Sequence, residues 1–342
     1  MNNSTPLISV ILPVYNVASY INEAIDSILK QTIQDYEILV IDDCSTDNTI
    51  SIIEAIKDSR IKIIRKEKNK GLIDSLNFGF KIAQGKYIAR MDGDDICYPN
   101  RFEEQISFLE DNSQYILCGS WAKVIGFDSV MKVKEKHDEI VTDFLLTNSI
   151  IHPTVMIRNK SLEKFEFDQS MIAVEDYDYW TKLCFEGKFY NIPKPLLLYR
   201  IHDNQVSTKY KDIQIKGDIK IRMNLYKKLM YDETIYKDSI LIKILYSNNY
   251  FNKNEFELLL KWFNELSIKN KKIKLFNDYF FEKTSNKIIR NLVFNVFFTN
   301  QKKNINQKDR IQIFKLLPVN EKLFVLRLKI KEKIKYLSKS KV

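Results

Sequence analysis

Apolar runs and segments with helical periodicity alternate along the N-terminal part of the chain. Runs such as LISVILP and YEILVI are short and continuously apolar, as expected of strands that are buried on both faces. Strands of this kind are predicted at residues 7–13, 36–41, 60–65 and 86–91, and helices at residues 18–29, 49–56 and 71–83. This alternation predicts an α/β fold with a doubly wound, mostly parallel sheet flanked by helices.

The alternation becomes looser after residue 98, although further elements are predicted as far as residue 210. They are a helix at 101–111, a strand at 115–119, a strand-like segment at 121–136, a further segment at 152–158, a helix at 175–186 and a short closing segment at 196–200. Residues 211–342 carry apolar residues at helical spacing, interrupted only by Gly217 and Pro318. The pattern therefore predicts an α/β domain at residues 1–210 and a helical region at residues 211–342.

Charge separates the same two parts. Residues 1–210 hold 24 Lys and Arg against 31 Asp and Glu, whereas residues 211–342 hold 30 against 13. Within residues 321–337, an apolar stripe at helical spacing is formed by Leu323, Leu326, Ile330, Ile334 and Leu337. A basic amphipathic helix of this kind predicts binding to an anionic membrane surface, and the alternative is that the stripe packs on the first domain. No zinc motif or RNA-binding motif accompanies the charge, which disfavours nucleic acid as a partner.

The remaining composition points to the cytoplasm. The four cysteines lie far apart and form no CxxC pair, which disfavours a zinc site and a disulfide framework. The N-terminus lacks the basic segment of a signal peptide, and no apolar run approaches the length needed to span a bilayer. We therefore expect a cytoplasmic protein that associates with the inner face of the cell membrane through its basic region.

Polar clusters follow three of the predicted strands, at residues 13–16, 42–47 and 92–95. In an open parallel sheet, ligands bind beyond the carboxyl ends of the strands, so the three clusters are expected to converge on one crevice. Asp92, Asp94 and Asp95 repel one another unless a cation compensates their charge. Mg²⁺ or Mn²⁺ takes oxygen ligands and leaves coordination positions open for a substrate diphosphate. The alternative is a solvated acidic turn.

The cluster at residues 42–47 allows two interpretations. Asp42 and Asp43 precede a predicted helix, where carboxylates are favourable N-terminal neighbours. A carboxylate at this position could instead accept the ring N–H of a uracil, with Tyr15 as a stacking face one strand away. The residues alone leave both interpretations open.

Six motifs in order along residues 6–208 resemble one known family. VILPVYN, VIDDCSTDNT and MDGDD are similar to motifs of family 2 inverting glycosyltransferases with the GT-A fold. IHPTVMIR, EDYDYW and LLLYRIHDNQVS resemble later motifs of its bacterial polysaccharide branch. The resemblance does not extend into the basic C-terminal region.

The resemblance implies roles at the donor side of the site. Tyr15 would stack on the uracil of a UDP-sugar, Asp43 would contact its polar edge, and Pro13 belongs to the same donor-binding motif. Asp94 would contact the ribose or the phosphates. Asp95, together with Asp94, would hold Mn²⁺ or Mg²⁺, and Asp92 would support both.

On the acceptor side, the resemblance places the general base at Asp176, with Glu175 as the rival. An acceptor hydroxyl becomes a good nucleophile when a carboxylate removes its proton as the bond forms, and one direct displacement inverts the anomeric centre. The alternative for this acidic pair is a helix N-terminus whose dipole favours negative charge. Trp180 would be an acceptor platform or a core residue.

The later motifs contain three further candidates for donor binding. His152 would contact the donor phosphates, His202 would sit on a lid that closes over the donor, and Arg200 would neutralise diphosphate charge. Each histidine could equally be a structural hydrogen-bond partner.

These features predict an inverting glycosyltransferase that moves a hexose or N-acetylhexosamine from a UDP-sugar to a saccharide or lipid-linked saccharide. The expected process is synthesis of a capsule, O-antigen or lipooligosaccharide. One alternative is a metal-dependent nucleotidyltransferase, which is disfavoured because no Gly- and Arg/Lys-rich loop follows the first strand. The other is a catalytically inactive membrane- or sugar-binding protein of the same fold.

Overall fold

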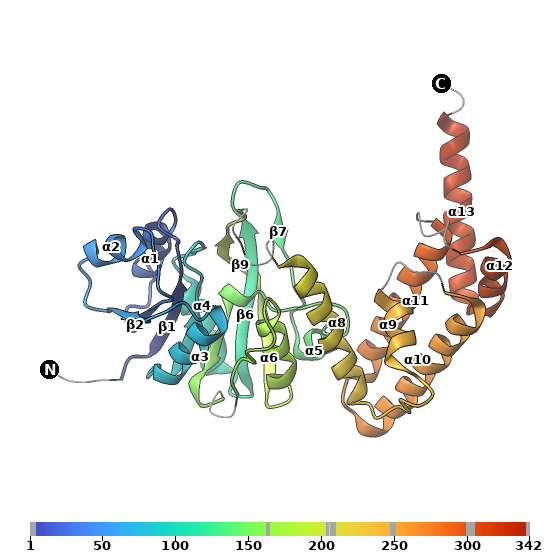
Figure 1. Cartoon of the computed structure of the whole chain (residues 1–342), viewed down its shortest axis with the longest axis horizontal. Helices are drawn as coiled ribbons and strands as arrows, with labels where there is room; N and C mark the ends of the chain where they lie inside the picture. The colour runs from blue at the N-terminus through green and yellow to red at the C-terminus, as the bar shows by residue number, and fades with distance from the viewer. Residues whose placement is uncertain are drawn as a thin grey trace. The chain divides into compact units, whose positions relative to one another are not determined.

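The computed structural model describes residues 5–161, 165–202, 205, 210–246, 251–298 and 305–339, and the side chains of α13 up to residue 331. Contacts divide the chain into two compact units, Met1–Ile221 and Arg222–Val342 (Figure 1). The division falls inside helix α8 (Lys211–Lys227). The expected functional roles of residues 1–210 and 211–342 stay predictions.

The first unit is built on a central sheet whose first half is parallel. Its strands run in the order β3-β2-β1-β4, with β1 at Ile8–Val14, β2 at Tyr36–Asp42, β3 at Ile61–Arg65 and β4 at Tyr87–Arg90. Every residue of β1, β2 and β4 is buried, which explains why these strands are recognisable as continuous apolar runs.

The second half of the sheet is mixed. It continues from β4 through β8 (Met156–Arg158), β6 (Tyr115–Val124), β9 (Lys188–Tyr199) and β5 (Ile96–Cys97), while β7 (Val130–Met131) pairs with β6. β8 is antiparallel to both β4 and β6, whereas β9 is parallel to β6. The parallel expectation therefore describes the β3–β4 half. β9 also begins earlier than the segment predicted at 196–200, because Pro193, Pro195 and a shift of register with β6 obscure its alternation.

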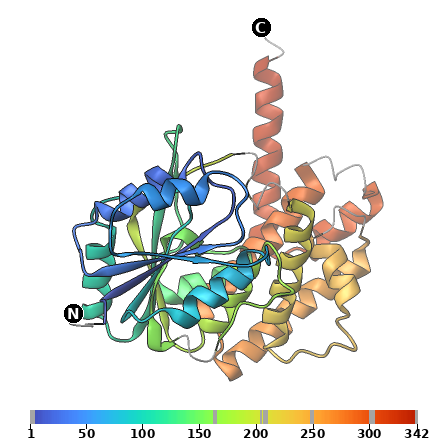
Figure 2. The same ribbon diagram turned by 60° about the vertical axis from the view of Figure 1, so that its left-hand side comes forward.

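Helices cover both faces of the parallel half (Figure 2). They are α1 (Ile21–Leu29), α2 (Thr49–Ala55) and α3 (Leu72–Ile82). In the mixed half, α4 (Arg101–Asp111) packs on β6 and α5 (His137–Asp143) on β9, and α6 spans Glu175–Leu183. α1 and α2 pack with alternate residues of β1 and β2 in one core. α3 packs on the opposite face, where Gly79 lies so close to Ile11 that an added Cβ would come within 2.7 Å of its Cγ2 atom. The predicted α/β fold is confirmed.

The second unit is helical, as predicted. Besides the end of α8, it contains α9 (Asp238–Tyr246), α10 (Lys253–Ile273), α11 (Asp278–Phe298), α12 (Gln307–Leu316) and α13 (Val319–Lys339). Trp262 of α10 is fully buried at its centre and meets Tyr226 edge to face, with ring centroids 4.8 Å apart. Within the described part of the chain, none of the helices combines the length and the apolarity needed to cross a membrane.

Candidate active site

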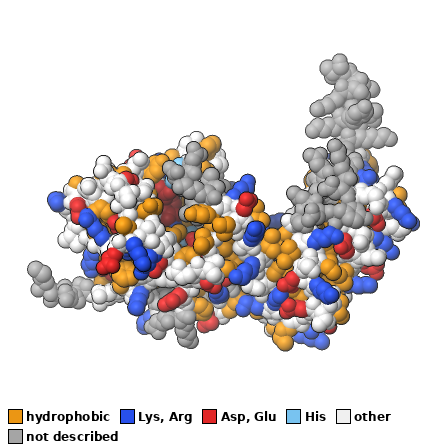
Figure 3. All heavy atoms as spheres, in the orientation of Figure 1, with side chains coloured by type: hydrophobic (Ala, Val, Ile, Leu, Met, Phe, Trp, Pro, Cys, Tyr) orange, Lys and Arg blue, Asp and Glu red, His pale blue; other side chains and the backbone are white. Residues whose placement is uncertain are grey.

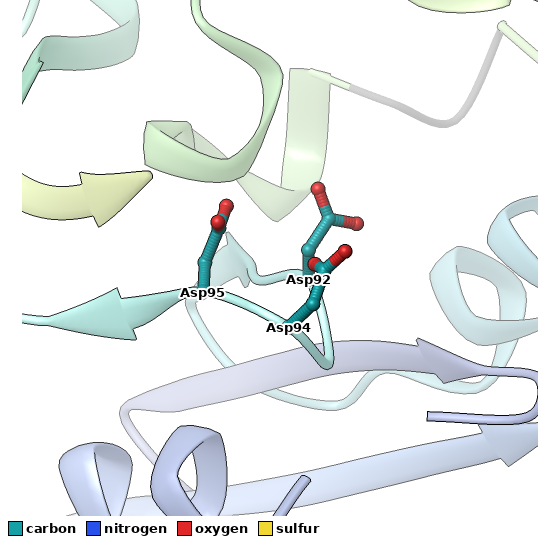
Figure 4. Close-up of side chains that lie close together, drawn as sticks. All are labelled: Asp92, Asp94 and Asp95. Atoms are coloured by element: carbon teal, nitrogen blue, oxygen red, sulfur yellow. The ribbon is translucent and has the colours of Figure 1, made fainter. Parts of the chain in front are cut away.

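The acidic motif forms the turn that connects β4 to β5. Asp92, Asp94 and Asp95 each offer a carboxylate oxygen within 4.8 Å of the others, and Figure 4 shows the three side chains on the same side of the turn. Gly93 lets the turn pass close to the start of α1, since a Cβ there would lie 3.2 Å from Val17, which precedes the helix, and 3.4 Å from Ile21. The structure thus brings together three carboxylates that the sequence places in one motif.

Asp95 is the most confined of the three carboxylates. It is buried, and its Oδ1 atom accepts a hydrogen bond from the backbone N–H of Arg200 at 2.9 Å. Its Oδ2 atom is buried and has no hydrogen-bond partner among the described residues. Burial, together with the negative charges of Asp92 and Asp94, raises the pKa of Asp95 well above its usual range. A buried carboxylate oxygen without a hydrogen-bond donor, such as Oδ2 of Asp95, is suited to bind a cation.

Arg90, the last residue of β4, is a buried cation that sequence reasoning missed. Its guanidinium forms an ion pair with Asp92, and its side chain is 3% exposed. Burial opposes its charge, but the negative charges of Asp92, Asp95 and Asp176 outweigh this and raise the pKa of Arg90. The signal was present in the sequence, because one arginine ends an otherwise apolar strand directly before three aspartates.

A second acidic pair opens helix α6. Glu175 is buried, whereas Asp176 is partly exposed and its Oδ2 atom accepts a hydrogen bond from the Asn148 side chain at 2.8 Å. Burial raises the pKa of both carboxyls, and the negative charge of Asp176 raises that of Glu175 further. The charge of Arg90 lowers both pKa values and so partly offsets these effects. The structure therefore brings the two acidic groups under the influence of one arginine, although they are far apart in sequence.

The segment after β9 contacts the acidic motif. Arg200 donates from Nε to the carbonyl oxygen of Asp94 at 2.8 Å and from its guanidinium to Glu23 at 2.6 Å. The Nε2 atom of His202 lies 2.8 Å from Oδ2 of Asp94, and its ring stacks on Tyr20 with centroids 5.0 Å apart. The structure thus brings Arg200 and His202 to the acidic motif, and their expected roles toward the donor stay predictions. Residues 203–204 and 206–209, which complete the expected lid, lie outside the described residues.

The polar clusters at residues 13–16 and 42–47 differ in how far their side chains are exposed. Asp43 is buried, and its carboxylate accepts hydrogen bonds from Lys66 Nζ at 2.6 Å and from the backbone N–H groups of Lys70 and Gly71 at 2.9 and 2.7 Å. It therefore fixes the loop between β3 and α3. Tyr15 follows β1 and leaves 47% of its surface exposed, whereas Pro13 is buried within β1.

The structure corrects the expectation for Trp180. Its side chain is 0% exposed and packs edge to face on His152 and Tyr179, with centroid distances of 5.6 and 5.2 Å. An acceptor platform needs an open ring face, so that interpretation is wrong and the core alternative holds. Trp180 belongs to an aromatic core that also contains His152, Phe167 and Tyr179.

His152 belongs to the same aromatic core. Burial, assisted by the charge of Arg90, lowers its pKa well below the usual range and keeps the ring neutral. Its Nε2 atom is buried without a hydrogen-bond partner among the described residues. The expected contact of His152 with donor phosphates stays a prediction.

We expect Arg90→Met to destabilise the fold by about 3–5 kcal/mol, because it leaves the Asp92 carboxylate without its buried partner. Urea unfolding followed by circular dichroism measures the change. Lys123→Met is the matched control, since its pairing with Asp128 at 3.9 Å is exposed and should contribute less than about 1 kcal/mol. An equal, small effect of both substitutions would contradict the importance of the buried pair.

Comparison with known proteins agrees with this arrangement. Residues 9–174 match the sequence model of "Glycosyl transferase family 2". A protein of Haemophilus influenzae named as an uncharacterized glycosyltransferase is 37% identical over 233 residues, which cover 64% of this chain and 72% of the relative. WfgD of Escherichia coli, a UDP-Glc:α-D-GlcNAc-diphosphoundecaprenol β-1,3-glucosyltransferase, is 32% identical over 217 residues, or 62% of this chain and 85% of the relative.

Two solved structures share the fold. The structure of residues 1–349 of Staphylococcus aureus TarS in complex with UDP-GlcNAc covers 83% of this chain and 90% of its own, with a TM-score of 0.53 and 18% identity. The mannosyltransferase PcManGT of Pyrobaculum calidifontis, in complex with GDP-Man and Mn²⁺, covers 86% and 88%, with a TM-score of 0.53 and 16% identity. At these identities the likeness concerns the fold alone. From the family match, the similar relatives and this fold, we conclude that the chain belongs to glycosyltransferase family 2 and has the GT-A fold.

Proposed function

We propose that the protein transfers a hexose or N-acetylhexosamine from a UDP-sugar to a saccharide or lipid-linked saccharide, with inversion of the anomeric centre. The observation that carries this proposal is the pair of acidic groups around Arg90, one with an unpartnered carboxylate oxygen and one at the start of α6. The process would be synthesis of a bacterial capsule, O-antigen or lipooligosaccharide. The protein would act at the inner face of the cell membrane, where a lipid-linked acceptor is found.

The donor would bind at the carboxyl ends of β1, β2 and β4. The exposed ring of Tyr15 is free to stack on uracil. Oδ2 of Asp43 accepts one hydrogen bond among the described residues, from the backbone N–H of Gly71. A carboxylate oxygen can accept a second hydrogen bond, so the same atom would accept the ring N–H of uracil. The name of WfgD, which is 32% identical to this chain, specifies UDP-Glc, and this supports a UDP-sugar as the donor.

A divalent cation, Mn²⁺ or Mg²⁺, would be held by Asp94 and Asp95, with Asp92 in support. The residues fit such an ion, because the three carboxylates converge and Oδ2 of Asp95 is buried without a partner among the described residues. When bound, the ion would supply positive charge that stabilises the departing nucleoside diphosphate. Arg200 and His202 would add positive charge or hydrogen bonds beside the same diphosphate.

Asp176 would act as the general base. It is the more exposed member of its pair, and the hydrogen bond from Asn148 orients its carboxylate. It would take the proton of the acceptor hydroxyl as that oxygen attacks the anomeric carbon, while the bond to the diphosphate breaks on the opposite face. Glu175 is buried beside it and remains the rival for this role.

Family membership removes the nucleotidyltransferase alternative. An inactive protein of the same fold is the alternative that assays must address.

The first test is release of nucleoside diphosphate from a panel of UDP- and GDP-sugars, with Mn²⁺ or with EDTA. We expect release from a UDP-sugar, its loss in EDTA, and a decrease of about 100-fold or more in Asp95→Asn, because a group that stabilises leaving-group charge is removed. Asp128→Asn, which changes an exposed aspartate of the same unit, is the control. Release that persists in EDTA would rule out the metal-dependent mechanism, and no turnover of any donor would favour the inactive alternative.

The second test concerns the base. Asp176→Asn should lower transfer to an acceptor by about 100-fold or more while UDP affinity, measured by calorimetry, stays unchanged. Glu175→Gln should have a much smaller effect, and the reverse order would assign the base to Glu175.

The pH profile gives an independent check on the same base. The raised pKa of Asp176 means that the catalytic carboxylate becomes protonated at a higher pH than an ordinary aspartate. Wild-type kcat/KM should therefore fall about tenfold per pH unit as the pH drops below that raised pKa. A rate that stays constant down to about pH 4, near the usual aspartate pKa, would contradict this role.

A further inference from the structure

Helix α13 carries two apolar faces, and one of them is covered within its own unit. Val325 is fully buried on this face, and the Glu321 carboxylate receives a hydrogen bond from Arg290 of α11 at 2.6 Å. The Arg290 guanidinium also lies over the ring of Phe324, 5.0 Å from its centroid. These contacts attach α13 to α11 and fix which side of the helix faces the unit.

The opposite face is apolar and is not covered by the other described helices of its own unit. This face consists of Val319, Leu323, Leu326 and Ile330, which are 70%, 47%, 47% and 59% exposed. We refer to these four residues as the α13 stripe. Their spacing of four, three and four residues places them on one line of an α-helix. At 100° per residue, this line lies about half a turn from Glu321 and Val325. The stripe is therefore a second apolar face of the helix, separate from the one that packs on α11.

Basic residues border the stripe on both sides. Helical spacing places Arg327 and Lys331 along one side and Lys322 and Lys329 along the other. Arg327, Lys329 and Lys331 are exposed, and Figure 3 shows many further Lys and Arg side chains over the visible face of this unit. An apolar line between two rows of cations is the pattern of a helix that lies in the interface of a bilayer.

We propose that the α13 stripe binds the surface of an anionic phospholipid bilayer, with its aliphatic side chains among the lipid headgroups and its flanking cations against the lipid phosphates. The proposal deepens the proposed function by assigning a surface through which the enzyme reaches a lipid-linked acceptor. Binding itself involves no turnover, so it can be measured separately from transfer.

Charge favours a bilayer over a second copy of this chain. Glu321 is the one acidic residue among the described side chains of α13, and Arg290 already binds it. Two stripes packed against each other would bring rows of cations together, whereas Glu321, the acidic side chain described on this helix, lies on the other face. Anionic headgroups supply the complementary charge along the whole row. The electrostatic attraction to the bilayer becomes stronger with each Lys or Arg near its surface.

The test is sedimentation of the full-length protein with phosphatidylcholine vesicles, with or without phosphatidylglycerol. We expect phosphatidylglycerol to raise the partition coefficient about tenfold or more and high salt to reverse the increase, because added salt screens the attraction. The triple variant Leu323→Asn, Leu326→Asn, Ile330→Asn should lose at least about tenfold in binding.

A matched triple variant controls for the loss of exposed aliphatic side chains. Ile235, Ile268 and Ile311 of the same unit are 55%, 49% and 51% exposed, and changing all three to Asn should leave vesicle binding unchanged. Both triple variants should keep the wild-type melting temperature, since the replaced side chains are exposed. Both should also keep wild-type nucleotide release in the absence of vesicles, so a failure of membrane binding is distinguishable from a failure of catalysis.

Three results would overturn the proposal. One is equal vesicle binding by the stripe variant and the wild type. Another is binding that does not depend on phosphatidylglycerol. The third is that neither protein binds vesicles, while light scattering shows a wild-type dimer that the stripe variant disrupts. That result would make the stripe an interface between copies of the chain.

Discussion

The buried charge of Arg90 is the constraint on which the site depends. A guanidinium inside the protein needs acceptors or carboxylates to compensate its charge, and the crowded carboxylates of the acidic motif in turn favour a nearby cation. Arg90 pairs directly with Asp92, and the charges of Asp95 and Asp176 also act on it. One arginine at the end of β4 thereby links the proposed metal side of the site to the proposed base.

The change of direction within the sheet explains how distant segments reach this arginine. The parallel strands β3-β2-β1-β4 deliver the first three polar clusters to one edge, as alternating strands and helices do in general. Beyond β4, the antiparallel strand β8 runs back beside Tyr87–Arg90 and is followed by the segment that leads to α6. β9 then runs along β6 and ends at Tyr199, and the backbone N–H of the next residue, Arg200, donates to Asp95. Parallel strands thus assemble the proposed donor side, and the mixed half adds the second acidic pair.

The aromatic core beneath α6 supports that second pair. Trp180 and His152 carry motif positions that resemble functional ones, yet both are buried in the interior, where Trp180 packs against His152 and Tyr179. A motif shows that a residue type recurs at a position, and it does not distinguish a side chain that contacts substrate from one that holds such a side chain in place. Burial makes that distinction, and for Trp180 it assigns packing.

The sequence by itself determined the elements of the parallel half, the helical nature of the C-terminal region and the membership of the acidic residues in one motif. Those features depend on local patterns, such as apolar runs and helical spacing, that neighbouring residues create among themselves. Only the tertiary structure decided that Arg90 faces carboxylates from two motifs, that β9 begins at Lys188, and that Trp180 is buried while Leu326 and Ile330 are exposed. Burial and the pKa of a side chain depend on residues distant in the chain, which periodicity along the sequence does not specify.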